Sequence, residues 1–165
     1  AIAVSPEVYE KYGVETYSDL AKVSKDLVFG GGYEFHNRQD GFEGLVERYG
    51  MTFKGEPKKM EISLKYKAIG NGDMDVTDAF ATDAPIRQYN LKVLKDDKNF
   101  FPPYYAAPIV NNKTLEKYPE LEGLLNQLAG RIDDAAMTEL NYQVDVEGKS
   151  VESVAKNFLT EQGLI

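Results

Sequence analysis

The side chains in this sequence that are best suited to a functional site are aromatic rings. The 165 residues include 11 tyrosines and 8 phenylalanines, but no cysteine and a single histidine, His36. The lack of cysteine excludes disulfides, thiolate zinc ligands and cysteine nucleophiles. One histidine does not build a typical zinc site, and no G-x-S-x-G motif supports a hydrolase, so we expect a structural or cleft-lining imidazole. The sequence therefore predicts no catalytic centre, no metal site and no cofactor.

A run of three glycines, Gly30, Gly31 and Gly32, follows a predicted strand and invites comparison with phosphate-binding loops. The run lacks the Lys-Ser/Thr pair of a P-loop, and Phe35 occupies the place of the third glycine in a dinucleotide-binding fingerprint. Glycine also permits tight turns and close approach of the backbone to another group. We therefore expect these glycines to let the backbone turn or approach a ligand, rather than to bind a nucleotide.

A polar stretch further along has the spacing of a calcium loop but lacks the two residues that define one. Val76 stands where an EF-hand needs glycine, and Thr82 stands where it needs a bidentate glutamate. We therefore expect the polar residues to serve in turns and at a strand end that faces a cleft. These residues are Asn71, Asp73, Asp75 and Asp78.

Two tyrosines, Tyr104 and Tyr105, directly follow a stiff segment that contains Pro102 and Pro103. Two consecutive prolines remove backbone donors and force an extended path, so this segment cannot lie inside a helix. A rigidly held tyrosine can present its ring face to a cation, which is worth roughly 0.5–2 kcal/mol per ring. An arginine on the opposite side could hold a carboxylate with two hydrogen bonds. This segment is therefore the best candidate for ligand binding.

The composition is that of a globular protein with an acidic surface. Hydrophobic residues make up 42% of the chain and charged residues 28%, with a net charge of −8, which argues against nucleic acid or an anionic membrane as a partner. No apolar run approaches the roughly 20 residues that span a bilayer. The opening residues 1–4 are apolar, with no methionine and no basic lead-in, so we expect a piece of a longer chain.

Strands alternate with helices up to about residue 110, and the rest of the chain is helical in pattern. This order predicts a mostly parallel α/β sheet, followed by helices that cover a different sheet. Ser5 is predicted to cap the first helix, Ser18 the second, and Gly13 and Gly50 to end two helices. The predicted strands are 1–4, 27–29, 60–62, 74–80, 91–94 and 105–110, and the predicted helices are 7–12, 18–23, 40–49, 63–69, 85–89, 114–129, 133–141 and 151–162.

Three motifs, in this order and spacing, resemble the glycine betaine/carnitine/choline-binding proteins of ABC importers. They are E-F-x-x-R-x-D-G-x-x-G-L over residues 34–45, D-V-x-D-A-F-x-T-D over residues 75–83, and L-x-D-D-K-x-F-F-P-P-Y-x-A-A-P over residues 94–108. The resemblance extends over essentially the whole chain.

The resemblance implies a periplasmic-binding-protein-like α/β fold of the type II, Venus-flytrap kind, with the ligand between two lobes. It implies that Arg38 binds the ligand's carboxylate, and that Tyr104 and Phe80 are rings of an aromatic cage for a trimethylammonium group. The family often has tyrosine at the position of Phe80. Phenylalanine keeps the ring face and loses only the hydroxyl, so cation binding is expected to survive. The alternatives are that Arg38 is a capping or salt-bridging residue near the helix start at Asp40, and that Phe80 is a core residue at a strand end.

The family's chain starts well before Ala1, so we expect residues 1–105 to form one complete ligand-binding lobe and residues 106–165 to form the mostly helical C-terminal part of the other. The implied function is extracytoplasmic, cell-surface capture of a quaternary-ammonium solute, without catalysis, for delivery to an ABC permease. The anchor is either a lipid or a fusion to the permease. A further chain is expected to cover the incomplete lobe. The alternatives are a ligand-sensing regulatory domain of the same fold, and capture of another betaine such as ergothioneine.

Overall fold

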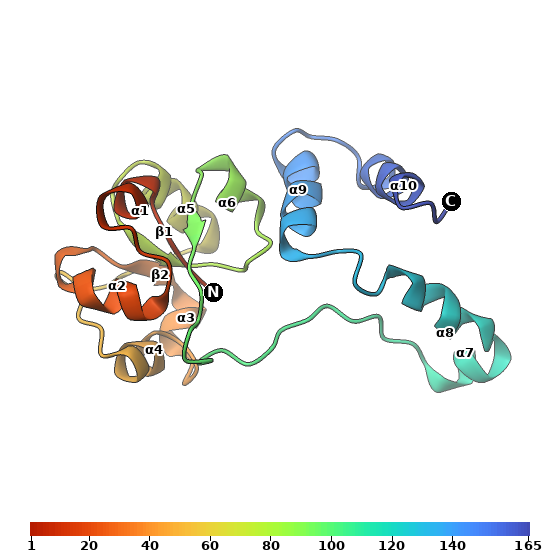
Figure 1. Ribbon diagram of the computed structural model, residues 1–165, viewed down its shortest axis with the longest axis horizontal. Coiled ribbons are helices and arrows are strands. Elements are labelled where there is room, and N and C mark those ends of the chain that lie inside the picture. Colours follow the sequence, from red (N-terminus) through yellow and green to blue (C-terminus); the bar gives the residue numbers. More distant parts are fainter. The chain divides into compact units, whose positions relative to one another are not determined.

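The computed structural model describes all residues, Ala1–Ile165, and the chain divides into two compact units, Ala1–Pro102 and Pro103–Ile165 (Figure 1). The two units differ in kind. The first contains every strand and nearly every buried residue, whereas the second contains helices and extended segments only.

The first unit contains two small sheets. In the three-stranded sheet, β1 (Ile2–Val4) lies between β4 (Val76–Asp78) and β5 (Lys92–Val93) and is antiparallel to both. In the two-stranded sheet, β2 (Gly30–Gly32) and β3 (Lys58–Met60) are parallel. The prediction of a mostly parallel sheet is therefore wrong for the three-stranded part. A short, fully buried run of apolar residues has the same sequence pattern whichever way its neighbours run, so strand direction could not be predicted.

The first two helices begin and end at local capping signals. Helix α1 (Pro6–Tyr12) begins where the Ser5 hydroxyl accepts a hydrogen bond from a backbone N–H, and it ends at Gly13 with φ 62°. These bounds confirm the prediction. Helix α2 (Tyr17–Val23) is capped by Thr16 rather than by Ser18, because Thr16 forms a reciprocal capping box with Asp19.

Four more helices complete the first unit. Helix α4 (Phe42–Tyr49) ends at Gly50 as predicted, whereas α3 (Tyr33–Asn37) was not predicted at all. The strand predicted at 27–29 lies instead at the glycine run, which forms β2. Of the predicted residues only Phe29 takes part in a β-bridge, which it makes with Val76. The helices are α3 (Tyr33–Asn37), α4 (Phe42–Tyr49), α5 (Ile62–Gly70) and α6 (Ala84–Gln88), with a short 3-10 turn at Ser24–Asp26.

Strand β1 is shared between the two hydrophobic clusters of the first unit. Ile2 and Val4 belong to one cluster, together with Phe29, while Ala3 belongs to the other, together with Tyr66. Successive residues of a strand point to opposite faces, so the central strand supplies both clusters at once. The sheet is thereby held on both sides.

The second unit is helical, and almost none of it is buried. The predicted helix 114–129 is interrupted at Tyr118 and Pro119, since proline supplies no backbone N–H to the preceding turn. The predicted strand 105–110 is wrong: the segment is extended but pairs with no strand, and residues 105–109 are exposed. The helices are α7 (Asn112–Lys117), α8 (Glu120–Leu125), α9 (Asp134–Asp145) and α10 (Val151–Glu161), with a 3-10 turn at Asn126–Leu128.

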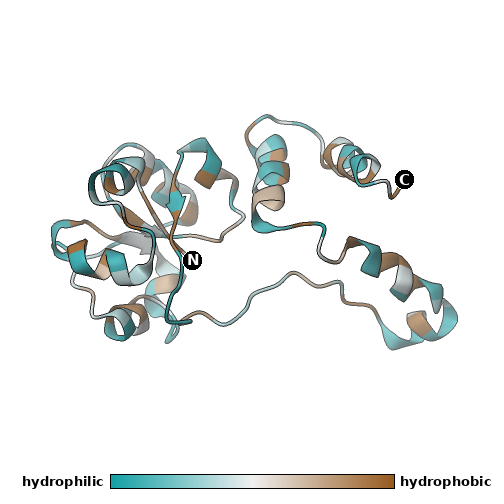
Figure 2. Cartoon of the chain, in the orientation of Figure 1, coloured by the Kyte–Doolittle hydropathy of each residue, from teal (hydrophilic) through white to brown (hydrophobic).

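Helices α7 to α10 each mix hydrophobic and hydrophilic residues, as the colouring of Figure 2 shows. Val154 is nevertheless the one buried hydrophobic residue of this unit, and Leu124 is 61% exposed. No helix in either unit is both long enough and apolar enough to span a bilayer.

Candidate ligand-binding edge of the first unit

Three strands of the first unit end at a common edge. Strands β2 and β3 run in parallel register from Gly30 opposite Lys58 to Gly32 opposite Met60, and a parallel bridge between Phe29 and Val76 aligns β4 with them. We call this edge the carboxyl edge: Gly32, Met60 and Asp78 with the residues that directly follow each. In α/β proteins ligands bind outside the carboxyl ends of strands, so this edge is where a ligand is expected.

The glycines of β2 let the backbone approach the side chains of the β4 segment. A Cβ atom on Gly30 would lie 2.3 Å from Met74 Sδ, and one on Gly31 would lie 2.7 Å from Asp78 Oδ1. Both distances are shorter than van der Waals contact, so any other residue here would require the Met74 or Asp78 side chain to move. The expectation of a tight turn is wrong, because these glycines form a strand. Their backbone does approach other groups closely, and these groups are the side chains of Met74 and Asp78.

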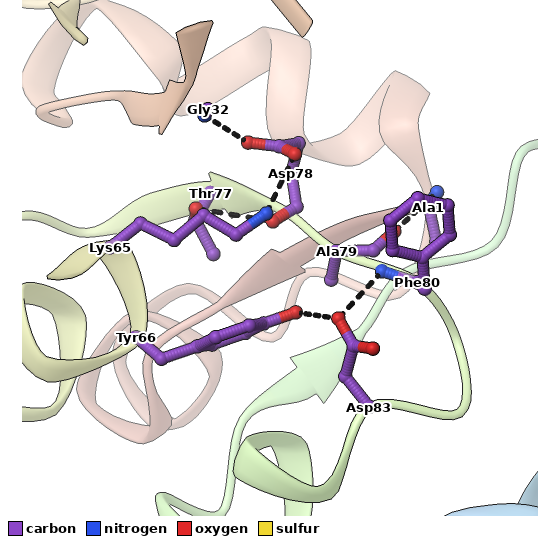
Figure 3. A network of polar contacts seen from close by, with 9 residues as sticks. All are labelled: Ala1, Gly32, Lys65, Tyr66, Thr77, Asp78, Ala79, Phe80 and Asp83. Carbon is purple, nitrogen blue, oxygen red and sulfur yellow. Dashed lines mark hydrogen bonds and ion pairs between the residues drawn. The ribbon is translucent and has the colours of Figure 1, made fainter. Parts of the chain in front are cut away.

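A buried ion pair lies at the β4 end of the carboxyl edge (Figure 3). Lys65 Nζ lies 2.7 Å from Asp78 Oδ2, and the Lys65 side chain is only 1% exposed. The other oxygen, Asp78 Oδ1, accepts the Gly32 N–H at 2.9 Å. A buried lysine needs such a partner, since desolvation of an unpaired charge costs several kcal/mol. Asp78 therefore ties α5, β2 and β4 together at the edge.

Lys65 was not recognised from the sequence, although one signal was present. It lies four residues before the buried Ile69, which is the spacing of one face of a helix. A lysine on the buried face of a helix predicts a buried carboxylate partner.

Phe80 lies two residues beyond β4, and its side chain is 51% exposed. Its backbone N–H donates to Asp83 Oδ2 at 3.2 Å, and the Tyr66 hydroxyl donates a short hydrogen bond to the same oxygen. Burial, reinforced by Asp83, raises the pKa of the Tyr66 phenol, so this hydroxyl stays protonated and remains a donor. The two hydrogen bonds to Asp83 thus hold the loop that carries Phe80 (Figure 3), while Phe80 itself is half exposed.

Arg38 follows the last residue of α3 and forms a two-point ion pair with Asp40. Its Nε lies 2.8 Å from Asp40 Oδ1 and its second contact, from Nη2, is 2.5 Å from Oδ2. The hydrogen bonds from Arg38 lower the pKa of the Asp40 carboxyl. The Arg38 side chain is 60% exposed, and its Nε and Nη2 both contact this carboxylate.

Tyr104 lies in the second unit, just beyond Pro103, and its side chain is 87% exposed. Arg38 and Phe80 lie in the first unit, where Arg38 ends α3 and Phe80 follows β4.

The turn before the two prolines is organised by Asp96, a residue of the third motif to which the sequence assigned no role. The Asp96 carboxylate accepts the N–H groups of Phe100 and Phe101 at 3.0 and 2.8 Å, and the Tyr49 hydroxyl donates to it in a short hydrogen bond. The Tyr49 oxygen in turn accepts the N–H of Lys98 at 2.7 Å. This network fixes the chain up to the end of the first unit.

His36 belongs to the core. Its ring packs edge-on against Phe29 and lies 4.9 Å from the centre of Phe42, and its Nε2 is buried without a hydrogen-bond partner. Burial lowers the pKa of this imidazole, which favours its neutral form. No three histidine, aspartate or glutamate side chains gather as a metal site.

Comparison with known proteins assigns a family to this fold. The family described as the substrate-binding domain of the ABC-type glycine betaine transport system matches residues 1–161. The chain belongs to this family. The resemblance noted in the sequence motifs is therefore confirmed, and so is the periplasmic-binding-protein-like α/β fold.

Individual members of this substrate-binding family are similar over nearly all of the chain. The ergothioneine transport permease/ergothioneine binding protein EgtU of Helicobacter pylori is 43% identical over 99% of this chain and 30% of its own length. The carnitine transport binding protein OpuCC of Listeria monocytogenes is 40% identical over 94% of this chain and 51% of its own length. A crystal structure of a glycine betaine/carnitine/choline ABC transporter is 44% identical, with a TM-score of 0.92 over 99% of this chain and 60% of that one. The chain thus spans about a third to a half of these two curated relatives.

Proposed function

We propose that this chain is part of an extracytoplasmic receptor that captures a quaternary-ammonium solute and delivers it to an ABC permease. The observation that carries the proposal is the match of the substrate-binding family across residues 1–161. The receptor binds and releases its ligand without chemical change, so it is not an enzyme. The relative from H. pylori carries both a permease and a binding protein in its name, which favours fusion to the permease over a lipid anchor.

The ligand is recognised at two chemically different places. Phe80 offers an exposed ring to the trimethylammonium group, and the nearby Asp83 carboxylate adds a favourable negative potential. Tyr104 supplies a second ring of the cage. Arg38 binds the carboxylate of the ligand with two hydrogen bonds and exchanges Asp40 for it.

The solute is glycine betaine, carnitine, choline or a related betaine. Ergothioneine is the second candidate, because the protein from H. pylori named for it is 43% identical to this chain. Choline has no carboxylate, so the role of Arg38 favours the betaines.

Residues 1–105 form a complete ligand-binding lobe, and residues 106–165 belong to the other lobe. The boundary between the compact units at Pro102 supports a division at this place. The exposed apolar side chains of the second unit, such as Leu124, Ile109 and Val151, support a further chain or segment that covers this lobe. Binding of a betaine by these 165 residues alone is therefore far weaker than by a complete receptor. Micromolar affinity of this chain in calorimetry would contradict that statement.

A thermal-shift panel at millimolar ligand concentration tests the function. Trimethylammonium compounds are expected to stabilise the chain modestly, since a ligand at a concentration equal to its Kd adds about 0.4 kcal/mol. Phe80→Ala and Tyr104→Ala are expected to remove this stabilisation. Tyr118→Ala is the matched control, because Tyr118 is a 46% exposed tyrosine of the second unit outside the motifs. Indifference to every trimethylammonium compound would refute the proposal.

A further inference from the structure

We propose that Gly41 and Gly44 are positioning residues for Arg38: they hold the turn that carries its side chain, and so make the site prefer a solute with a carboxylate over one without. The inference rests on the proposed function, because it concerns how Arg38 is presented to the carboxylate of the ligand. It extends that function by assigning this selectivity to two glycines of the first motif, which have no side chain to contact a ligand.

Arg38 begins a closed turn that joins helices α3 and α4, which lie side by side (Figure 1). Its carbonyl oxygen accepts the Gly41 N–H at 3.1 Å, so residues 38–41 form a β-turn. Its own N–H donates to the Glu34 carbonyl at 3.1 Å, which joins the turn to the end of α3. Helix α4 follows at once, since the Leu45 N–H donates to the Gly41 carbonyl at 3.0 Å. The backbone of this turn therefore sets the direction in which the Arg38 side chain leaves the protein.

Gly41 lies directly against the backbone of the turn. A Cβ atom at this position would lie 1.9 Å from the Phe35 carbonyl oxygen and 2.9 Å from the Arg38 carbonyl oxygen. Both distances are shorter than van der Waals contact. Both partners are backbone atoms, which cannot rotate away as the end of a long side chain can. A side chain on residue 41 would therefore displace the backbone of the turn.

Gly44 contacts the same turn from three residues further along the chain. A Cβ atom there would lie 2.5 Å from the Gln39 carbonyl oxygen and 3.2 Å from two carbons of the Phe100 ring. The Phe100 ring can give way, whereas the carbonyl of Gln39, the residue after Arg38, is part of the turn. The two glycines thus lie against three carbonyl groups: that of Arg38 itself, one three residues before it and one directly after it.

The anchoring of both helices in the core decides which part of the chain would move. His36 of α3 is only 9% exposed and Leu45 of α4 is fully buried. Phe35, whose carbonyl Gly41 contacts, packs against Phe29 with 6.2 Å between the ring centres. Neither helix can shift without disturbing a close-packed core. The Arg38 side chain, by contrast, is 60% exposed, so the displacement falls on the turn that carries it.

The direction of Arg38 matters for a carboxylate and not for a trimethylammonium group. A guanidinium holds a carboxylate by two parallel hydrogen bonds from a rigid fork, so a rotated fork loses at least one of them. The trimethylammonium group contacts ring faces, and Phe80 is carried by a different loop, which Asp83 holds. A displaced turn should therefore weaken the binding of carnitine, which has a carboxylate, and spare choline, which has none.

Ligand-observed NMR titrations of the full chain with carnitine and choline test the inference. Gly41→Ala and Gly44→Ala should each weaken carnitine binding about tenfold, as expected for one lost hydrogen bond between charged groups, and change the Kd of choline less than about twofold. Gly70→Ala is the matched control, because a Cβ atom there would lie 2.3 Å from the Tyr89 ring, at the last residue of α5. It should lower the thermal midpoint of unfolding and leave the preference for carnitine unchanged. Gly123→Ala should change neither, because a Cβ atom there would meet nothing within 4 Å.

Three results overturn the inference. If the glycine variants weaken carnitine and choline equally, or weaken neither, these glycines do not position Arg38. If Gly41→Ala does not fold, Gly44→Ala decides alone. Failure of Gly44→Ala to fold, as seen by far-UV circular dichroism, also overturns the inference, because this glycine would then serve the fold rather than the site.

Arg38→Ala separates these results from failure of the proposed function. It should weaken carnitine binding and spare choline. If it does so while the glycine variants do not, only the inference fails. If Arg38→Ala leaves carnitine binding unchanged, carboxylate recognition by Arg38 is itself refuted, and if neither ligand binds the unmodified chain, both proposals are overturned.

Discussion

Replacing Lys65 by methionine tests whether the buried ion pair holds the carboxyl edge together. Methionine keeps the length and apolar stem of lysine but removes the charge that lies 2.7 Å from Asp78. Asp78 would then be a carboxylate that is only 15% exposed and that keeps the Gly32 N–H as a donor. The fold should remain, because the packing of α5 is preserved, but it should be markedly less stable.

The expected loss follows from the burial of the pair. Removing one partner of a buried ion pair typically costs about 3–5 kcal/mol. The residual exposure of Asp78 lets water compensate in part, which places the loss near 3 kcal/mol. The double variant Lys65→Met/Asp78→Asn removes both charges, while the amide oxygen can still accept the Gly32 N–H. It should recover most of the loss, because uncharged replacements of a buried pair are often neutral or stabilising.

Urea unfolding, followed by the near-UV circular dichroism of the buried tyrosines, measures these differences. Lys67→Met is the matched control, because Lys67 lies on the same helix and is exposed, and it should change the free energy of unfolding by less than about 0.5 kcal/mol. The reasoning is refuted if Lys65→Met costs no more than Lys67→Met. It is also refuted if the double variant is no more stable than Lys65→Met.

Three further predictions concern other polar groups. Burial lowers the pKa of His36 below the value of 6.5 that it has in the unfolded chain. As the pH drops through 6.5, the unfolded chain therefore takes up a proton before the folded chain does, and the free energy of unfolding decreases. The variant His36→Phe should lose less of this free energy between pH 7 and 5.5, as measured by urea titrations. An equal pH dependence of both proteins would contradict this. The variant Asp40→Asn removes the carboxylate that pairs with Arg38, so Arg38 becomes available to the carboxylate of a ligand. In NMR titrations the affinity for carnitine should rise a few-fold, while the affinity for choline, which has no carboxylate, should stay the same. An equal gain in affinity for choline would contradict carboxylate recognition by Arg38. The variant Asp96→Asn should lower the free energy of unfolding in urea by about 1–3 kcal/mol. The carboxylate of Asp96 accepts from the N–H groups of Phe100 and Phe101 and from the Tyr49 hydroxyl, whereas asparagine has one acceptor oxygen and an NH₂ group that only donates. An unchanged urea midpoint would contradict this role of Asp96.

The motif residues of the candidate site could be selected from the sequence, but their surroundings could not. Arg38 and Phe80 stood out through the family motifs, and their binding roles stay predictions. The contacts that hold these residues come from elsewhere in the chain. The Tyr66 hydroxyl that fixes the loop below Phe80 reaches Asp83 across 17 positions. No local pattern marks such a pair, because either residue could as well face solvent.

Features of the fold that depend on neighbouring residues in the chain were readable from the sequence. Ser5 and Gly13 bound α1 and Gly50 ends α4, since a cap is made by hydrogen bonds and backbone angles within a few residues. One local error was the choice of Ser18 over Thr16, where the capping box with Asp19 decided the start of α2.

What only the tertiary structure decided involves distant partners. The antiparallel direction of β1, the burial of Lys65 against Asp78 and the unpaired state of residues 105–110 each depend on which segment comes to lie alongside. A strand exists only if a partner accepts its hydrogen bonds, and a lysine is buried only if a carboxylate meets it. The sequence alone thus determined both ends of α1, the end of α4, the absence of cysteine chemistry and the family. The carboxyl edge, where Asp78 accepts the Gly32 N–H, arises only where three distant segments meet.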